Sequence, residues 1–547
     1  ILAARIDRLG EREKTVLQTG AVIGKEFPES ILRRVVDLEE ADLASALRAL
    51  VAAEFFYEEA LYPEPIYAFK HPLTQEVAYR SQLGERRRQL HTDVARAIED
   101  AYPTKLGEQA ALLAQHWEAA GEPLVAATWH QRAADWIGVR DRAETLRHWT
   151  EIRRLLATVP ASPETLALGV MARDAMMLHG LFCGMSDEEA ETLFTEGMDL
   201  AKRLPEPSSR IGLLTRLGSR KSLTGVPAEA LAPLEEARRL AVETGDPFLE
   251  FMTRFAMLGA AMNLGRLEDA IVHFDHCEAV CGGDPEYGTG ITGFSVHAYL
   301  LAMRGFVLGN QGHWTEALRF AERAIEIARE RRDHEMLVIG GAVGCTACEM
   351  IGDAPGALAH ARGAMRATEA GAEGIRQTAM MNLGRAHLMQ REWRVAIDTL
   401  TASLSETRKA RTGLALEAMI LALLAAGHLG AGDLASARET ADEAVAVARR
   451  RKTRVVEIVA LLARVRVLLA TDGASPAVER DLDDATALIQ ATTARGYLPF
   501  VHVERARLAA LRGDASASRH HAGEARRLFS EMGGPARAEQ TARELER

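Results

Sequence analysis

A short turn motif, glycine followed five residues later by alanine, recurs along the C-terminal two-thirds of the 547-residue chain. A glycine just past a helix end can adopt the left-handed conformation that ends the helix, so each copy predicts a break between two helices. Successive turns lie 39 to 47 residues apart. The eight copies, three of them degenerate, are Gly225/Ala230, Gly265/Ala270, Gly312/Ala317, Gly352/Ala357, Arg391/Ala396, Gly432/Ala437, Gly473/Val478 and Gly513/Ser518.

Two further positions are small in the same register. Seven residues after the turn alanine, on the second helix, stand Ala237, Cys277, Ala324, Ala364, Ser403, Ala444, Ala485 and Ala525. Seven residues before the turn glycine, on the first helix, six of the eight copies are small: Gly218, Gly305, Cys345, Gly384, Ala425 and Ala506, with Leu258 and Arg466 as exceptions. Small side chains at helical spacing let neighbouring helices approach closely. The pattern therefore predicts a stack of helical hairpins.

This pattern resembles the tetratricopeptide repeat, with a period of about 40 in place of the usual 34. We expect an all-α fold in which two degenerate units, turning at Gly138/Ala143 and Met185/Ala190, precede the eight regular ones. About ten helix pairs would form a right-handed superhelix whose first helices line the concave face. That face is the expected binding surface for a protein partner or a small effector.

The N-terminal part does not follow the repeat. Helical patterns are followed by β-forming residues between Phe55 and Phe69, around a turn at residues 62–65, and then by two more helices. We expect a small winged-helix domain with one β-hairpin. The expected division is a winged-helix domain with its following helices at 1–104, irregular helices and degenerate repeats at 105–205, and regular repeats at 206–547.

The segment PEPIYAFKHPLTQEVAYRSQLGERRRQLHTDVARAIE, residues 63–99, preceded by LQTGAVIGKEF, resembles the part that follows the nucleotide-binding domain in bacterial STAND-type ATPases. It is similar in particular to multidomain proteins that join a class III nucleotide cyclase, sometimes a Ser/Thr kinase, to an ATPase core and a tetratricopeptide tail. The resemblance implies that this chain is the non-catalytic winged-helix and repeat part. A chain that begins with Ile1 rather than Met fits that expectation.

The resemblance also implies one site residue, His71. In related STAND proteins the winged helix supplies a histidine, in a Met-His-Asp motif, that contacts the β-phosphate of the bound nucleotide. The sequence FKHPLTQEVAY places His71 at a similar position, although Lys70 and Pro72 depart from the motif. ATP or ADP would then bind the complete protein, with the ATPase domain completing the site. The alternative is that His71 only packs the hairpin against the next helix.

Other patterns argue against chemistry in this chain. No phosphate-binding loop is present, since the nearest fragment, Gly24-Lys25, is followed by Glu26 and lacks the preceding glycine. Two groups of potential metal ligands, Cys345/Cys348 and the cluster His273/His276/Cys277/Cys281, include cysteines in the small-residue positions. Packing accounts for those cysteines, and a structural zinc site needs four converging ligands. We expect neither a catalytic centre nor a metal site.

Charge and hydropathy limit the partners. The formal net charge of -11 gives no attraction for nucleic acid or for an anionic membrane. The third helix, where a winged helix reads DNA, begins with Glu39, Glu40 and Asp42 and has Arg48 as its only basic residue. No apolar run is long enough to span a bilayer, and five cysteines are too few for a disulfide framework. We expect a cytoplasmic protein.

Two further features are open to more than one interpretation. The 47-residue spacing between Gly265 and Gly312 accommodates an extra loop at 281–290, which either contacts a partner or is a tolerated surface insertion. The six tryptophans, mostly placed before the regular repeats, are expected to fill irregular packing. They are Trp117, Trp129, Trp136, Trp149, Trp314 and Trp393.

The leading functional hypothesis is a regulatory module. The repeats would bind an effector or partner, and the winged helix would transmit that event to an adjoining nucleotide-binding and effector region. The alternatives are a passive scaffold for protein assembly and a DNA-binding transcriptional regulator acting through the winged helix.

Overall fold

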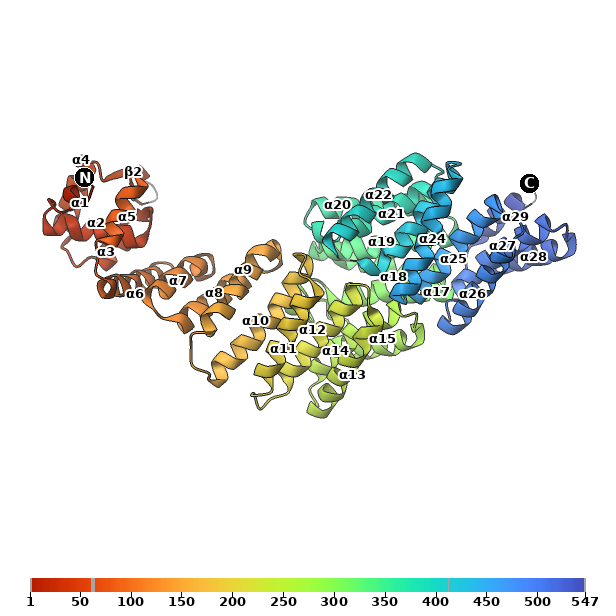
Figure 1. Ribbon diagram of the computed structural model, residues 1–547, viewed down its shortest axis with the longest axis horizontal. Helices are drawn as coiled ribbons and strands as arrows, with labels where there is room; N and C mark the ends of the chain where they lie inside the picture. Colours follow the sequence, from red (N-terminus) through yellow and green to blue (C-terminus); the bar gives the residue numbers. More distant parts are fainter. Residues whose placement is uncertain (1, 61–63, 412, 546–547) are drawn as a thin grey trace. The chain divides into compact units, whose positions relative to one another are not determined.

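A computed structural model describes residues 2–60, 64–411 and 413–545 (Figure 1). The chain divides into two compact units. The first comprises residues 1–180 with 199–204, and the second comprises residues 181–198 with 205–547. No helix in the described part of the chain is both long and apolar enough to cross a membrane.

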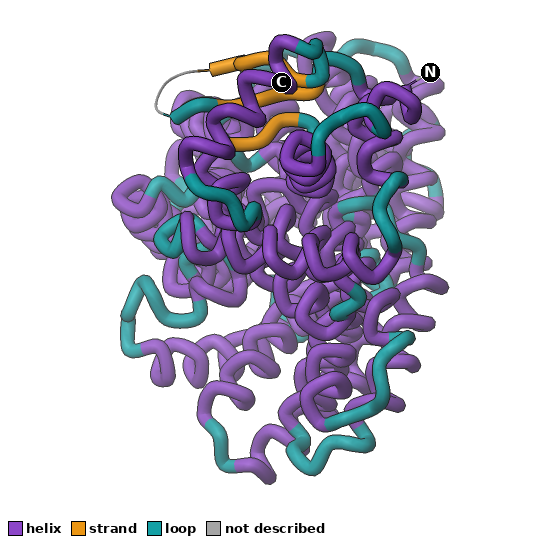
Figure 2. The backbone as a smooth tube through the Cα atoms, turned by 90° about the vertical axis from the view of Figure 1, so that its left-hand side faces the viewer, coloured by secondary structure: helices purple, strands orange, loops and turns teal. Residues whose placement is uncertain are grey.

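The first unit opens with a small mixed domain, which holds the three short strands drawn in Figure 2. The strands form one antiparallel sheet in the order β1-β3-β2. Strands β2 and β3 pair as expected, whereas β1 is a strand that the sequence did not reveal. The predicted turn residues Tyr62 and Pro63 lie outside the described residues. The elements are α1 (Leu2–Ile6), α2 (Glu11–Ile23), β1 (Glu26–Pro28), α3 (Glu29–Val35), α4 (Glu40–Ala52), β2 (Phe56–Ala60), β3 (Ile66–Phe69) and α5 (Pro72–Arg80).

Aromatic side chains hold this sheet against α2. The Phe27 ring lies 5.2 Å from that of Phe56, which lies 4.8 Å from that of Phe69. All three are buried. A side chain at Gly20 on α2 would meet the Phe27 ring at 2.9 Å, so a glycine is needed for the helix to lie this close. Burial of these rings contributes to the stability of the domain.

The rest of the first unit is a run of antiparallel helices. Gly138, the predicted turn, begins the short helix η1 (Gly138–Asp141) between α8 and α9. Pairs of buried histidines join neighbouring helices: Nδ1 of His91 lies 2.9 Å from Nδ1 of His116, and Nδ1 of His130 lies 2.8 Å from Nδ1 of His148. The helices are α6 (Gly84–Ala101), α7 (Leu106–Ala120), α8 (Pro123–Ile137), α9 (Arg142–Leu156) and α10 (Pro163–Phe182).

The second unit is a tetratricopeptide-like array of helical hairpins. Each of the eight predicted turns joins two helices, and each turn residue has a positive φ, including Arg391 at 62°. The first helices are α12 (Ser208–Leu223), α14 (Pro247–Asn263), α17 (Val296–Gln311), α19 (His334–Ile351), α21 (Arg376–Met389), α23 (Glu417–Gly430), α25 (Arg454–Thr471) and α27 (Leu498–Leu511). Their partners are α13 (Pro227–Thr244), α15 (Leu267–Cys281), α18 (Trp314–Arg331), α20 (Ala354–Glu369), α22 (Trp393–Ala410), α24 (Leu434–Arg451), α26 (Pro476–Thr492) and α28 (Ala515–Glu531).

Helix α11 (Asp187–Ala201) lies mostly in the second unit, and its last three residues belong to the first. The remaining elements of the second unit are α16 (Thr289–Thr292), η2 (Glu373–Ile375), η3 (Leu414–Leu416), η4 (Arg495–Tyr497) and α29 (Pro535–Leu545). The inserted loop at 281–290 packs against α14 through Tyr287, whose ring lies 4.9 Å from that of Phe251.

The small-residue positions allow the two helices of a pair to approach closely, as the sequence predicts. A side-chain carbon at Gly218 would lie 2.4 Å from Leu234 Cγ, and one at Gly384 would lie 2.5 Å from Leu400 Cγ. Both leucines are buried on the second helix of the same pair. A larger residue would therefore separate the two helices or force the leucine out of its preferred conformation.

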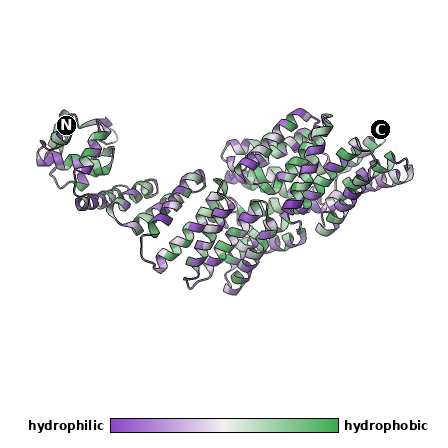
Figure 3. Ribbon diagram, in the orientation of Figure 1, coloured by the Kyte–Doolittle hydropathy of each residue, from purple (hydrophilic) through white to green (hydrophobic). Residues whose placement is uncertain are grey.

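The first helices form the inner layer of the array. The first helix of each pair contacts the first helix of the next pair; α12 contacts α14, for example, and α23 contacts α25. The second helices carry hydrophilic residues along one side (Figure 3), and α18 alternates buried alanines and isoleucines with exposed charges. This two-layer arrangement buries the first helices and exposes one face of the second.

The array also folds back on itself. Arg451 Nη1 donates to the Thr224 carbonyl at 3.4 Å, and Tyr497 Oη donates to Asn310 Oδ1 at 3.0 Å. The indole of Trp314 is fully buried, with its ring centroid 6.0 Å from that of Phe529. The last pairs therefore pack against the turns of the first ones, and successive windings of the superhelix touch.

Candidate functional site

The inner layer of the repeats is fully covered at α23. On this helix six consecutive residues, 420–425, are buried, so every face of it is covered. Partly open side chains lie on first helices both before and after α23, among them Glu349 on α19 and Arg466 on α25. Binding on the concave face stays a prediction.

Polar clusters interrupt this inner layer, and one of them centres on Arg385. Arg385 on α21 is 4% exposed, and its Nη1 donates to Glu349 Oε2 at 2.8 Å and to Thr346 Oγ1 at 3.1 Å. Burial works to lower the pKa of Arg385, but the carboxylate of Glu349 outweighs it and the pKa is raised. A buried arginine is stable only with such a partner. The cluster thus ties α19 to α21.

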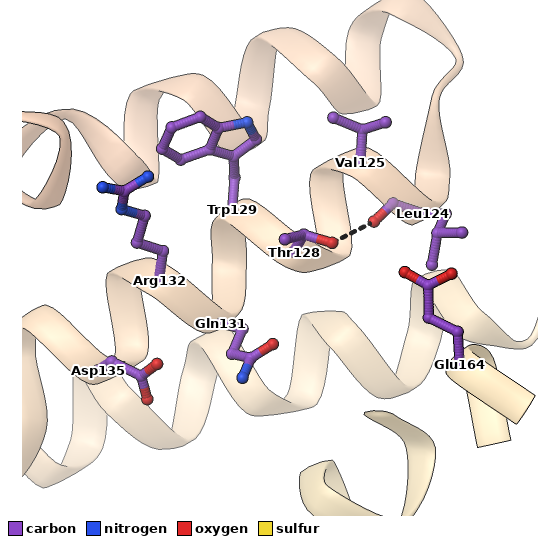
Figure 4. Close-up of a pocket in the computed structure, with 8 residues that line it drawn as sticks. All are labelled: Leu124, Val125, Thr128, Trp129, Gln131, Arg132, Asp135 and Glu164. Carbon is purple, nitrogen blue, oxygen red and sulfur yellow. Dashed lines mark hydrogen bonds between the residues drawn. The ribbon is translucent and has the colours of Figure 1, made fainter. Parts of the chain in front are cut away.

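An open pocket of about 430 Å³ lies on the first unit (Figure 4). All but one of its lining side chains come from α8, and the last comes from the start of α10. Helix α8 points its alanines and His130 into the core, which leaves the opposite face free. The lining residues are Leu124, Val125, Thr128, Trp129, Gln131, Arg132, Asp135 and Glu164.

Further exposed apolar side chains lie on the same unit. Trp136 on α8 is 48% exposed, and Val139 and Met171 are exposed to a similar degree. The expectation that the tryptophans fill irregular packing holds for Trp117 and Trp149, which are buried, and in part for Trp136, whose ring lies against Gly107 of α7 but is half-exposed. The spacing carried a signal, since residues four and seven apart share one helix face, and Val125, Trp129 and Trp136 follow it.

Charges complete the pocket. The guanidinium of Arg132 lies over the Trp129 ring, 5.1 Å from its centroid. The carboxylates of Asp135 and Glu164 form no ion pair with any residue that the structure describes. Asp135 is exposed, and partial desolvation by its neighbours raises the pKa of its carboxyl group. The pocket thus combines an apolar wall with two carboxylates that lack a cationic partner.

His71 lies at the N-cap of α5. Its Nδ1 accepts a hydrogen bond from the Leu73 amide at 3.2 Å, which places the proton of the neutral ring on Nε2. The side chain is exposed. The neighbouring Lys70 forms an ion pair with Glu54, 2.8 Å apart. A donor at a helix N-terminus suits a phosphate oxygen, so the geometry is compatible with the expected role.

The cysteine clusters lie in the packed interior. Cys277 and Cys345 are fully buried, and burial raises the pKa of each to about 12. Such thiols are inert at neutral pH. In the part of the chain that the structure describes, no three histidine, cysteine or acidic side chains are placed to hold a metal ion.

Helix α4, where a winged helix reads DNA, presents acidic groups. Asp42 pairs with Arg12 at 2.7 Å, and Glu40 pairs with Arg33 at 3.2 Å. The two arginines are thus engaged within the domain. A surface of this kind repels phosphate.

Comparison with known proteins supports the repeat architecture. A sequence model of the family described as anaphase-promoting complex subunit 5 matches residues 291–342 and 380–463, which lie within the regular array. No curated protein matches the sequence significantly. The fold is a tetratricopeptide-like helical repeat.

Solved structures of repeat proteins are similar at low identity. A Rap protein complexed with competence and sporulation factor is 14% identical over 68% of this chain and all of that chain, with a TM-score of 0.48. NprR in complex with its cognate peptide NprX is 14% identical over 66% of this chain and 99% of that one, with a TM-score of 0.45. A STAND protein with a tetratricopeptide repeat sensor from Pyrococcus horikoshii is 12% identical over 88% of this chain and 63% of that one, with a TM-score of 0.38. These values carry no conclusion about function.

Proposed function

We propose that this chain is a non-catalytic regulatory module that binds a protein partner. The observation that carries the proposal is the open pocket on α8, together with the exposed Trp136 on the same helix and the exposed Met171, which contacts the lining residue Gln131. Apolar side chains gathered around a pocket in this way mark interaction sites.

We further propose that the N-terminal domain is a winged helix that connects the repeats to a nucleotide-binding region. The element order helix, strand, helix, helix and hairpin, with strand order β1-β3-β2, is that of a winged helix and supports this assignment for residues 1–104. Residues 105–205 are then the irregular linking helices, and residues 206–547 the regular repeats. The winged helix transmits partner binding to a nucleotide-binding and effector region upstream, where His71 contacts the phosphate of ATP or ADP.

Neither alternative has comparable support. A passive scaffold needs no histidine donor at the N-terminus of α5, and the acidic surface of α4 disfavours DNA binding. Partner binding in the cytoplasm, coupled to a signalling ATPase, accounts for more of these features.

The test uses the complete protein with its upstream nucleotide-binding domain. Trp136→Ser removes the largest exposed apolar side chain of α8, and Val272→Ser, at a 60% exposed position on α15, is the matched control. We expect the Trp136 variant to change the rate of nucleotide exchange in the presence of cell extract, with the control like the wild type. Identical exchange rates in all three proteins would refute the proposal.

A further inference from the structure

The pocket on α8 has the size of a ligand site. Its volume of about 430 Å³ lies in the usual range for such pockets, roughly 300 to 1,000 Å³. Leu124 and Val125 form an apolar wall at one end, and the Trp129 indole stands beside them (Figure 4). The wall can accept one apolar side chain of a partner.

The charged side chains of the pocket indicate which chemical class of partner it binds. Arg132 already covers one face of the Trp129 ring, so an incoming cation does not find that face free. The other charged residues that line the pocket are Asp135 and Glu164, and neither forms an ion pair with a described residue. They come from different helices, and Figure 4 shows them toward opposite ends of the pocket. Two unpaired carboxylates attract a cationic group and repel a phosphate or another carboxylate.

The surroundings indicate an extended ligand. Trp136 and Val139 continue the exposed apolar surface along the end of α8, beyond the lining residues themselves. A small amine would leave that surface in water, whereas a peptide segment covers it. The net charge of -11 also favours a basic partner through long-range attraction.

We propose that this pocket binds a peptide segment that places an apolar side chain against Leu124 and Val125, one lysine or arginine at Asp135 and a second one at Glu164. The proposal rests on the proposed function, because it names the chemistry of the partner at the same surface.

The test measures binding of two labelled nine-residue peptides to the full chain by fluorescence anisotropy. One peptide alternates leucine and lysine, and the other has glutamate in place of each lysine. The variants are wild type, Asp135→Asn/Glu164→Gln, and the control Glu188→Gln/Glu236→Gln, which removes two exposed carboxylates from α11 and α13. The control separates local pairing from the overall charge of the chain.

We expect the lysine peptide to bind wild type and control at least about tenfold more tightly than the glutamate peptide. The Asp135/Glu164 variant should lose about tenfold in affinity for the lysine peptide. Equal loss in the control, equal binding of the two peptides, or no binding of either would overturn the proposal. If Trp136→Ser still alters nucleotide exchange in the complete protein, the interaction surface stands and only its preference for cations is wrong.

Discussion

The buried histidine pairs predict that the first unit loses stability in mild acid. In the first pair, Tyr79 Oη also lies 2.9 Å from His91 Nε2, while His116 Nε2 is buried without a hydrogen-bond partner in the described structure. The contacts are satisfied when both rings are neutral and His116 Nδ1–H donates to His91. A proton added to His116 Nε2 would be a buried, unpaired charge.

The size of the stability loss follows from the pKa values of His91 and His116. Burial lowers the pKa of His91 to about 4, with Arg87 adding to the effect, and that of His116 to about 3. The unfolded chain takes up these protons near pH 6.5, so stability is full above that pH and falls as the pH drops toward 4. Between pH 7.5 and 5.5 the loss is about 1.4 kcal/mol for each histidine, or about 3 kcal/mol for the pair.

The assay is urea unfolding of the full chain, followed by tryptophan fluorescence, at pH 7.5 and 5.5. Four of the six tryptophans lie in the first unit, so the signal reports mainly on it. The variant His91→Gln/His116→Gln should lose about 3 kcal/mol less than wild type between the two pH values. His71→Gln, at an exposed position, is the control. The same loss in wild type and the double variant would refute the reasoning. The second pair, His130 and His148, is present in both proteins and changes their stability with pH equally. Burial lowers the pKa of His130 to about 4, and the charged groups around the pair are Glu144, Arg147, Glu151 and Arg154.

Three further predictions concern the repeats. Gly384→Val should cost about 1–3 kcal/mol in thermal unfolding because its side chain would overlap Leu400, whereas Gly374→Ala, with open space around it, should change stability far less. Arg391→Gly should stabilise the array by up to about 1 kcal/mol, since Arg391 holds a φ of 62° that glycine adopts without strain, and a lower melting temperature would contradict this. Trp314→Ala should cost about 3–5 kcal/mol and speed proteolysis after residue 452, because it removes the fully buried indole that joins the windings; unchanged cleavage would argue against closure.

The hairpin array could be predicted because its signals are local. A positive φ is needed at each turn and a small side chain at each crossing, and both needs recur about every 40 residues. The second set of turns, between pairs, escaped prediction because charged or β-branched residues adopt the left-handed conformation there. They are Arg332, Arg411, Lys452 and Thr493. Strand β1 was missed because three residues carry no periodic pattern.

The candidate site was only partly predictable. His71 was found through a motif, whereas the pocket on α8 depends on which face of that helix the neighbouring helices cover. Trp129 and Trp136 share a face, but the sequence does not say whether a face of tryptophans is buried or open.

By itself, then, the sequence determined the helix pairs, their period and the close contact within each pair, since these follow from residues less than about 20 positions apart. Only the tertiary structure decided the closure of the array, the pairing of the histidines and the open face of α8. The bond from Arg451 to Thr224 spans 227 residues, and that from Tyr497 to Asn310 spans 187. Contacts at such separations depend on the accumulated curvature of every intervening pair, and no local pattern encodes that curvature.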